Sequence, residues 1–96
     1  MKPIETTCPV TKVAKLLSDV WTMLIMHALL TAPKRFCEHE RELEGISTRT
    51  LTNKLKKLEE DGLVIKNSEG AYEATPRGKG LKLIENAMRK YEKEYL

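Results

Sequence analysis

A row of polar and basic side chains between residues 47 and 60 has the composition of a nucleic-acid contact. Residues 49–57 contain four cations and no acidic residue. The leucines of this segment, Leu51, Leu55 and Leu58, recur at the spacing of one buried helix face. A rotation of 100° per residue places the polar side chains on the opposite face. These side chains are Arg49, Thr52, Asn53, Lys56, Lys57 and Glu60.

Each of these residue types has a matching partner on duplex DNA. Arginine pairs bidentately with guanine and asparagine with adenine in the major groove, so Arg49 and Asn53 are the predicted base contacts. Threonine and lysine reach phosphates. We expect positioning contacts from Ser47, Thr48, Thr52 and Lys56. The free amides at the start of the helix attract phosphate as well.

Other kinds of chemistry lack their motifs. The sequence contains no glycine-rich phosphate loop, no nucleophile motif and no carboxylate pair suited to a cleft, so we expect no enzyme. His27 and His39 have no second ligand at metal spacing, and neither cysteine lies in a CxxC motif. We therefore expect no metal ion and no cofactor.

Capping residues, prolines and glycines divide the chain into elements that position the polar row. Gly45 provides the tight turn between two helices, and Ser68-Glu69-Gly70 provides the turn of a hairpin. The expected order is a helix from Pro9 capped by Cys8, a helix from Asp19 to Leu30, a short helix from Arg35 or Phe36 to Glu44, a helix from Ser47 to Gly62, a hairpin and one long final helix from Pro76.

This order predicts a mainly α fold with a short β-hairpin, in one domain spanning 1–96. A short helix, a tight turn and a second helix over 36–61 form a helix-turn-helix, and a hairpin over 63–75 makes it winged. Lys66 is the one wing cation and is expected to reach phosphate. Residues 1–8 form an N-terminal arm.

The last segment, 76–96, has the pattern of a C-terminal dimerisation helix. Apolar residues follow one another there at steps of three and four, and a chain of 96 residues cannot bury all of them in its own small core. The predicted stripe is Leu81, Ile84, Met88, Tyr91 and Tyr95, widened by Leu83 and Ala87. The alternative is that this helix only packs on the second helix.

Length, charge and hydropathy fit this interpretation. The net charge of +3 suits a nucleic-acid partner without requiring one. No apolar run approaches the roughly 18 residues of a membrane span, and no signal-peptide pattern opens the chain. Two cysteines do not make a disulfide framework. We expect a cytoplasmic protein that does not bind membranes.

The ordered motifs resemble a known family. They are Cys8-Pro9-Val10, Trp21-Thr22, Leu24-Ile25, Pro33, Arg35-Phe36, Gly45-Ile46-Ser47, Arg49-Thr50-Leu51, Leu55, Leu58-Glu59 and Asp61-Gly62-Leu63. Together they are similar to the HxlR-type winged helix-turn-helix transcriptional regulators. The resemblance implies a homodimer that binds a two-fold-related operator, with the recognition helix over Ser47 to Glu60. It also implies a cysteine that senses oxidants or electrophiles in some members.

The sequence departs from the family pattern at several positions. Ser18-Asp19-Val20 stands where the family usually has glycines and a lysine, and Glu40 and Glu42 lie in a helix that is usually more basic. His39 replaces an aliphatic residue, and we expect it to be partly buried with one hydrogen bond. The acidic helix also supports the alternative function, a protein-docking module without sequence-specific DNA binding.

Cys8 is the candidate redox sensor. It lies at a predicted N-cap, where helix-end amides stabilise a thiolate, and Lys12 adds positive charge one turn on. The alternative is an unreactive small residue that merely begins the helix. Cys37 is expected to be packed, although it could also act as a resolving partner. The sequence identifies no small-molecule effector.

Overall fold

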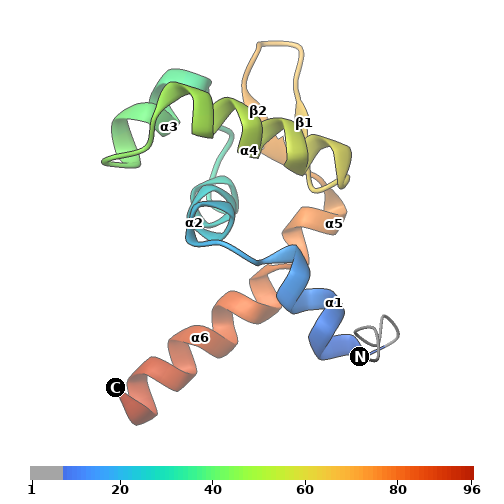
Figure 1. Ribbon diagram of the computed structural model, residues 1–96, viewed down its shortest axis with the longest axis vertical. Coiled ribbons are helices and arrows are strands. Elements are labelled where there is room, and N and C mark those ends of the chain that lie inside the picture. The colour runs from blue at the N-terminus through green and yellow to red at the C-terminus, as the bar shows by residue number, and fades with distance from the viewer. Residues whose placement is uncertain (1–7) are drawn as a thin grey trace, which may run out of the picture.

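Capping residues fix where the helices begin. The computed structural model describes residues 8–96, so most of the predicted arm lies outside the described residues. Asp19, Ser47 and Thr75 each accept an amide hydrogen bond as the N-cap of a helix, and Cys8 occupies its expected N-cap position without a side-chain cap hydrogen bond. The elements are α1 (Pro9–Leu16), α2 (Val20–Leu29), α3 (Phe36–Glu42), α4 (Thr48–Glu60), β1 (Val64–Lys66), β2 (Tyr72–Ala74), α5 (Pro76–Lys79) and α6 (Lys82–Tyr95) (Figure 1).

A tight turn joins α3 to α4 and completes the helix-turn-helix. Gly45 adopts φ +89°, a left-handed conformation that a residue with a Cβ rarely takes. Helix α3 ends at Glu42, two residues earlier than expected, because Leu43 leaves helical geometry and turns into the core. The two helices of the motif pack directly on each other.

The wing is a two-stranded antiparallel hairpin. Val64 pairs with Ala74, and Lys66 pairs with Tyr72. Lys34, just before α3, forms a further bridge to Tyr72 through two backbone hydrogen bonds of 2.9 and 2.7 Å. This bridge attaches the start of the helix-turn-helix to the wing, so it restricts movement of α3 relative to the hairpin.

Helix α2 supplies the centre of the core. Ile25 and Met26 are fully buried, and Trp21 packs half-buried against them. Leu24 is 39% exposed even though its helical spacing from Trp21 and Ala28 suggests a buried face, and Met26 is buried instead. Met26 can be buried because Gly78 brings α5 so close that a Cβ there would lie 3.0 Å from the Met26 methyl carbon. The other buried apolar residues are Leu29, Leu43, Leu51, Leu55, Leu58, Leu63, Val64, Ala74 and Leu81.

The long helix expected after Pro76 is interrupted. Helix α5 ends at Lys79, and α6 begins at Lys82 after a turn at Gly80 and Leu81. Two glycines within one turn weaken the helix, and the break rotates Leu81 into the core, where it is 5% exposed. Helix α6 then extends away from the rest of the molecule as an arm (Figure 1).

Within residues 8–96, no helix has the length and apolar character needed to cross a membrane.

Candidate nucleic-acid interface

Helix α4 presents the predicted polar row to solvent. Its leucines are at most 2% exposed, because they pack into the core. The opposite face carries exposed Ser47, Thr48, Arg49, Thr52, Asn53 and Lys56. These side chains are therefore exposed as predicted, and the described part of the chain gives neither Arg49 nor Lys56 an acidic partner.

The hydroxyls at the start of α4 are engaged within the protein. Ser47 accepts the Thr50 amide at 3.0 Å and so caps the helix. Thr48 donates to the Glu40 carboxylate at 2.6 Å, and Thr52 donates to the Thr48 carbonyl at 2.8 Å. Each threonine must therefore exchange its partner before it can donate to a phosphate.

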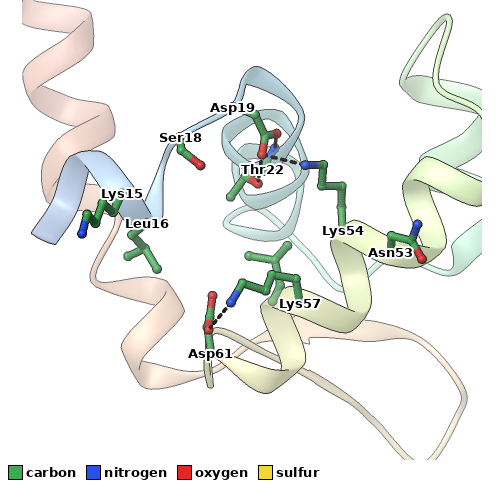
Figure 2. A pocket seen from close by; sticks show the side chains of 10 residues that line it. Lys15, Leu16, Ser18, Asp19, Thr22, Asn53, Lys54, Lys57 and Asp61 are labelled. Atoms are coloured by element: carbon green, nitrogen blue, oxygen red, sulfur yellow. Dashed lines mark hydrogen bonds and ion pairs between the residues drawn. The ribbon is translucent and has the colours of Figure 1, made fainter.

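Two lysines of α4 are held on the side of the helix that faces the α1–α2 connection (Figure 2). Lys54 donates to Asp19 at 2.8 Å, and Lys57 lies 3.4 Å from Asp61. Burial alone would raise the pKa of Asp19, but the Lys54 ammonium and the hydrogen bonds from Thr22 outweigh it and lower that pKa. The Asp19–Lys54 pair therefore links α4 to the start of α2.

A cavity of about 210 Å³ lies between α4 and the segment 15–22 (Figure 2). Its polar rim includes the two ion pairs just described and the Lys15 side chain, which has no acidic partner among the described residues. Asn53, a predicted base contact, lines one edge.

The wing provides one cation. The Lys66 ammonium lies 5.5 Å from the centre of the Tyr72 ring, a cation–π distance that fixes its direction. At the tip of the hairpin, the Asn67 side chain accepts the amides of Glu69 and Ala71 and rigidifies the turn. Lys66 is exposed, so phosphate contact is compatible with its position.

A family model described as HxlR-like helix-turn-helix matches residues 16–96. The chain belongs to this family. An uncharacterised HTH-type transcriptional regulator of Synechocystis is 30% identical, over 93% of this chain and 70% of that protein. YvaP, an uncharacterised HTH-type transcriptional regulator of Bacillus subtilis, is 33% identical over 88% of this chain and 84% of its own length. The crystal structure of quinone-bound YodB from B. subtilis matches with a TM-score of 0.84 and 30% identity, covering 92% of this chain and all of that one.

These comparisons and the fold establish the general function. The HxlR-like chain is a DNA-binding transcriptional regulator with a winged helix-turn-helix. Both expectations, the HxlR resemblance and the winged fold, are confirmed.

The apolar stripe of this HxlR-like regulator divides between two environments. Leu81 is buried and Ile84 half-buried against the core of the same chain, so these two predicted dimerisation residues already have packing partners within the protomer. The break at Gly80 causes this difference, because it turns the first residues of the stripe inward. Met88, Tyr91 and Tyr95 remain 49%, 59% and 70% exposed.

A buried carboxylate holds α6 to the body of the HxlR-like regulator. Glu85 is 6% exposed and lies 3.1 Å from His27 of α2, with Arg89 hydrogen-bonded to the same oxygen. Burial alone would raise the pKa of Glu85, but Arg89 and His27 outweigh it and lower that pKa. Sequence patterns did not identify this contact, because the signal is a single acidic residue on an otherwise exposed helix.

His39 is more deeply buried than expected. It is fully buried, and neither ring nitrogen has a hydrogen-bond partner among the described residues. The prediction of one hydrogen bond is wrong, because α3 buries the ring completely at a position where the family usually has an aliphatic residue.

The two cysteines lie in different environments. Cys8 is the N-cap residue of α1 and is half-exposed. The Thr11 amide, the Thr11 hydroxyl and the Val10 amide favour the thiolate, so the pKa of the Cys8 thiol lies below its usual value. Cys37 is exposed rather than packed as expected, because α3 directs it away from the core.

Proposed function

We propose that this regulator binds a two-fold-related operator as a homodimer, with α4 of each protomer in the major groove. The observation that carries the proposal is the exposed row opposite the buried leucines of α4. In a symmetric dimer, two such helices would lie about 34 Å apart on one face of the duplex.

Each residue of the row has a proposed role. Arg49 pairs with guanine and Asn53 with adenine, because their side chains match those base edges bidentately. Lys56 and the hydroxyls of Thr48 and Thr52 contact phosphates. Two flanking contacts complete the set, from Ser47 at the start of the helix and from Lys66 on the wing.

Alanine substitution tests this assignment. Arg49→Ala and Asn53→Ala should each weaken binding to the preferred operator by about tenfold to a hundredfold and relax its sequence. Arg77→Ala, which removes an exposed arginine from α5, is the matched control and should leave affinity within about twofold. If both recognition variants bind as tightly and selectively as the parent, the assignment is wrong.

A second copy of this chain is the proposed partner of the exposed apolar surface. Met88, Tyr91 and Tyr95 lie along the arm formed by α6, and Tyr91 and Tyr95 pack on each other with ring centres 5.1 Å apart. Val10 and Val13 of α1 are 75% and 39% exposed. Apolar side chains gathered in this way mark an interaction surface, and continuity with the DNA-binding body favours a symmetric pair.

The mass in solution tests the dimer. The parent should have the mass of two chains by light scattering at micromolar concentration, and Met88→Glu combined with Tyr91→Glu should reduce it to one. Lys90→Glu introduces a similar charge at an exposed polar position of α6 and should leave the dimer intact. A parent mass of one chain would refute the proposal.

We propose that Cys8 is a redox-sensitive thiol whose modification alters DNA binding. Its lowered pKa raises the fraction of reactive thiolate, and its position on α1 lies beside the proposed dimer surface. The similar YodB structure is quinone-bound, and a quinone is an electrophile that thiolates attack.

The test compares DNA affinity of the parent and Cys8→Ser before and after treatment with a quinone. Only the parent should lose affinity. If both proteins respond equally, or neither responds, Cys8 is not the sensor.

We also infer that the regulator has no catalytic activity and acts in the cytoplasm. Its relatives are named as transcriptional regulators and not as enzymes, which supports the first inference. They are bacterial proteins, and bacterial DNA lies in the cytoplasm, which supports the second.

A further inference from the structure

An acidic side chain lies directly against the start of the recognition helix. Glu40 of α3 accepts a hydrogen bond from the Thr48 hydroxyl at 2.6 Å, and Thr48 is the first residue of α4. Sequence patterns place the two residues in different helices and do not predict this contact.

The other two acidic residues of α3, Glu38 and Glu42, have partners away from α4. Glu38 accepts the Arg35 amide at 2.9 Å and caps its own helix. Glu42 pairs with Lys34 at 2.9 Å. Glu40 has no basic partner among the described residues, so its charge remains uncompensated beside the predicted DNA contacts.

A negative charge at this point opposes phosphate. The start of a helix attracts anions through its free amides and its dipole. Glu40 weakens that attraction, and in the free protein it also holds the Thr48 hydroxyl, which must exchange this partner before it can donate to a phosphate. Non-specific binding depends almost entirely on phosphate contacts, so it loses most from this arrangement.

A matching base can compensate the carboxylate. In the major groove, glutamate accepts a hydrogen bond from the N4 amino group of cytosine, its usual partner, and the N6 amino group of adenine is a second donor, whereas guanine and thymine present carbonyl oxygens there that repel it. An operator with cytosine beside the start of α4 therefore offsets the repulsion between Glu40 and the phosphates. Unrelated sequences keep that repulsion and bind more weakly. Repulsion of incorrect partners is a general source of specificity.

We propose that Glu40 is a specificity-determining residue of this regulator, which discriminates against unrelated DNA by placing a carboxylate at the start of the recognition helix. The proposal rests on the proposed recognition surface, since it requires α4 to enter the major groove.

The experiment measures affinity for two duplexes of equal length at one salt concentration. One is the operator obtained by selecting bound sequences from a random duplex pool, and the other is an unrelated sequence. Glu40→Gln keeps the size and the hydrogen-bonding capacity of the side chain and removes its charge. Glu44→Gln is the matched control, because it removes an exposed charge from the following turn that has no bond to Thr48. Circular dichroism checks that both variants fold.

Glu40→Gln should bind the unrelated duplex about threefold to tenfold more tightly, the size expected for one charge near a phosphate in water. Its ratio of operator to unrelated affinity should fall at least threefold below that of Glu44→Gln. Equal ratios in the two variants would overturn the proposal. If Arg49→Ala has no effect on the same duplexes, the recognition surface itself is wrong, so the two failures are distinguishable.

Discussion

The buried imidazole of His39 should make the protein less stable in mild acid. Desolvation lowers the pKa of His39 from the ordinary 6.5, and the charges of Glu42, Lys34 and Glu38 modify that effect in opposing directions. His39 in the unfolded chain therefore takes up a proton near pH 6.5, whereas His39 in the folded protein takes it up only at lower pH. The stability contribution is complete above pH 6.5 and is lost as pH falls through that value toward the folded pKa.

The size of this loss of stability follows from the uptake of one proton by His39 on unfolding. Between pH 7.5 and 5.5, a group that titrates at 6.5 in the unfolded chain and takes up no proton in the folded one reduces the free energy of unfolding by about 1.4 kcal/mol, so this is the largest effect His39 can have. His39→Leu removes this dependence. It also removes two buried nitrogens that have no hydrogen-bond partner among the described residues. Because one such group costs about 1–3 kcal/mol, the variant should be more stable than the parent at pH 7.5 by at least about 1 kcal/mol.

Urea unfolding followed by circular dichroism at both pH values, at one protein concentration, measures these differences. Asp19 and Glu85 titrate below this window, because their pKa values are lowered from 3.8 and 4.5. Other titrating groups are common to both proteins and cancel in the comparison. If parent and His39→Leu lose equal stability between pH 7.5 and 5.5, His39 is not the source of the acid sensitivity.

Two further substitutions test the packing that positions α4. Gly78→Ala should destabilise the protein by about 1–3 kcal/mol or more, because its Cβ would lie 2.2 Å from the Leu63 carbonyl oxygen. Gly80→Ala, whose Cβ would approach a carbonyl oxygen at 3.3 Å, should cost less in the same thermal unfolding assay, and the reverse order would contradict the close approach. Asp19→Ala should cost about 1–2 kcal/mol at pH 7 through the loss of the α2 cap, and Lys54→Ala less than about 1 kcal/mol through the ion pair alone. Equal costs in denaturant titrations would show that the cap contributes nothing.

Local signals predicted most of the fold. Ser47 and Gly62 bound α4 because a hydroxyl cap and a left-handed glycine act within a few residues. The periodicity of Leu51, Leu55 and Leu58 identified the buried face and hence the exposed row. These features depend on neighbouring residues, so the sequence alone was sufficient for them.

Contacts between distant elements escaped prediction. Asp19 and Lys54 are 35 positions apart, and only the packing of α2 on α4 brings them together. The break at Gly80 was not predicted because the apolar stripe begins only at Leu81, so its helical spacing says nothing about the residues before it. The full burial of His39 was not predicted, because the spacing of residues along one helix does not show how completely other elements enclose a side chain.

Selection of bound sequences from a random duplex pool tests dimeric DNA recognition through α4 in one experiment. We expect an enriched operator with two half-sites related by two-fold symmetry, their centres about 34 Å apart, and loss of preference at one position in each half when Arg49→Ala is used. Enrichment of no sequence, or of a single asymmetric site that Arg49→Ala selects equally well, would show that α4 does not read DNA in this way.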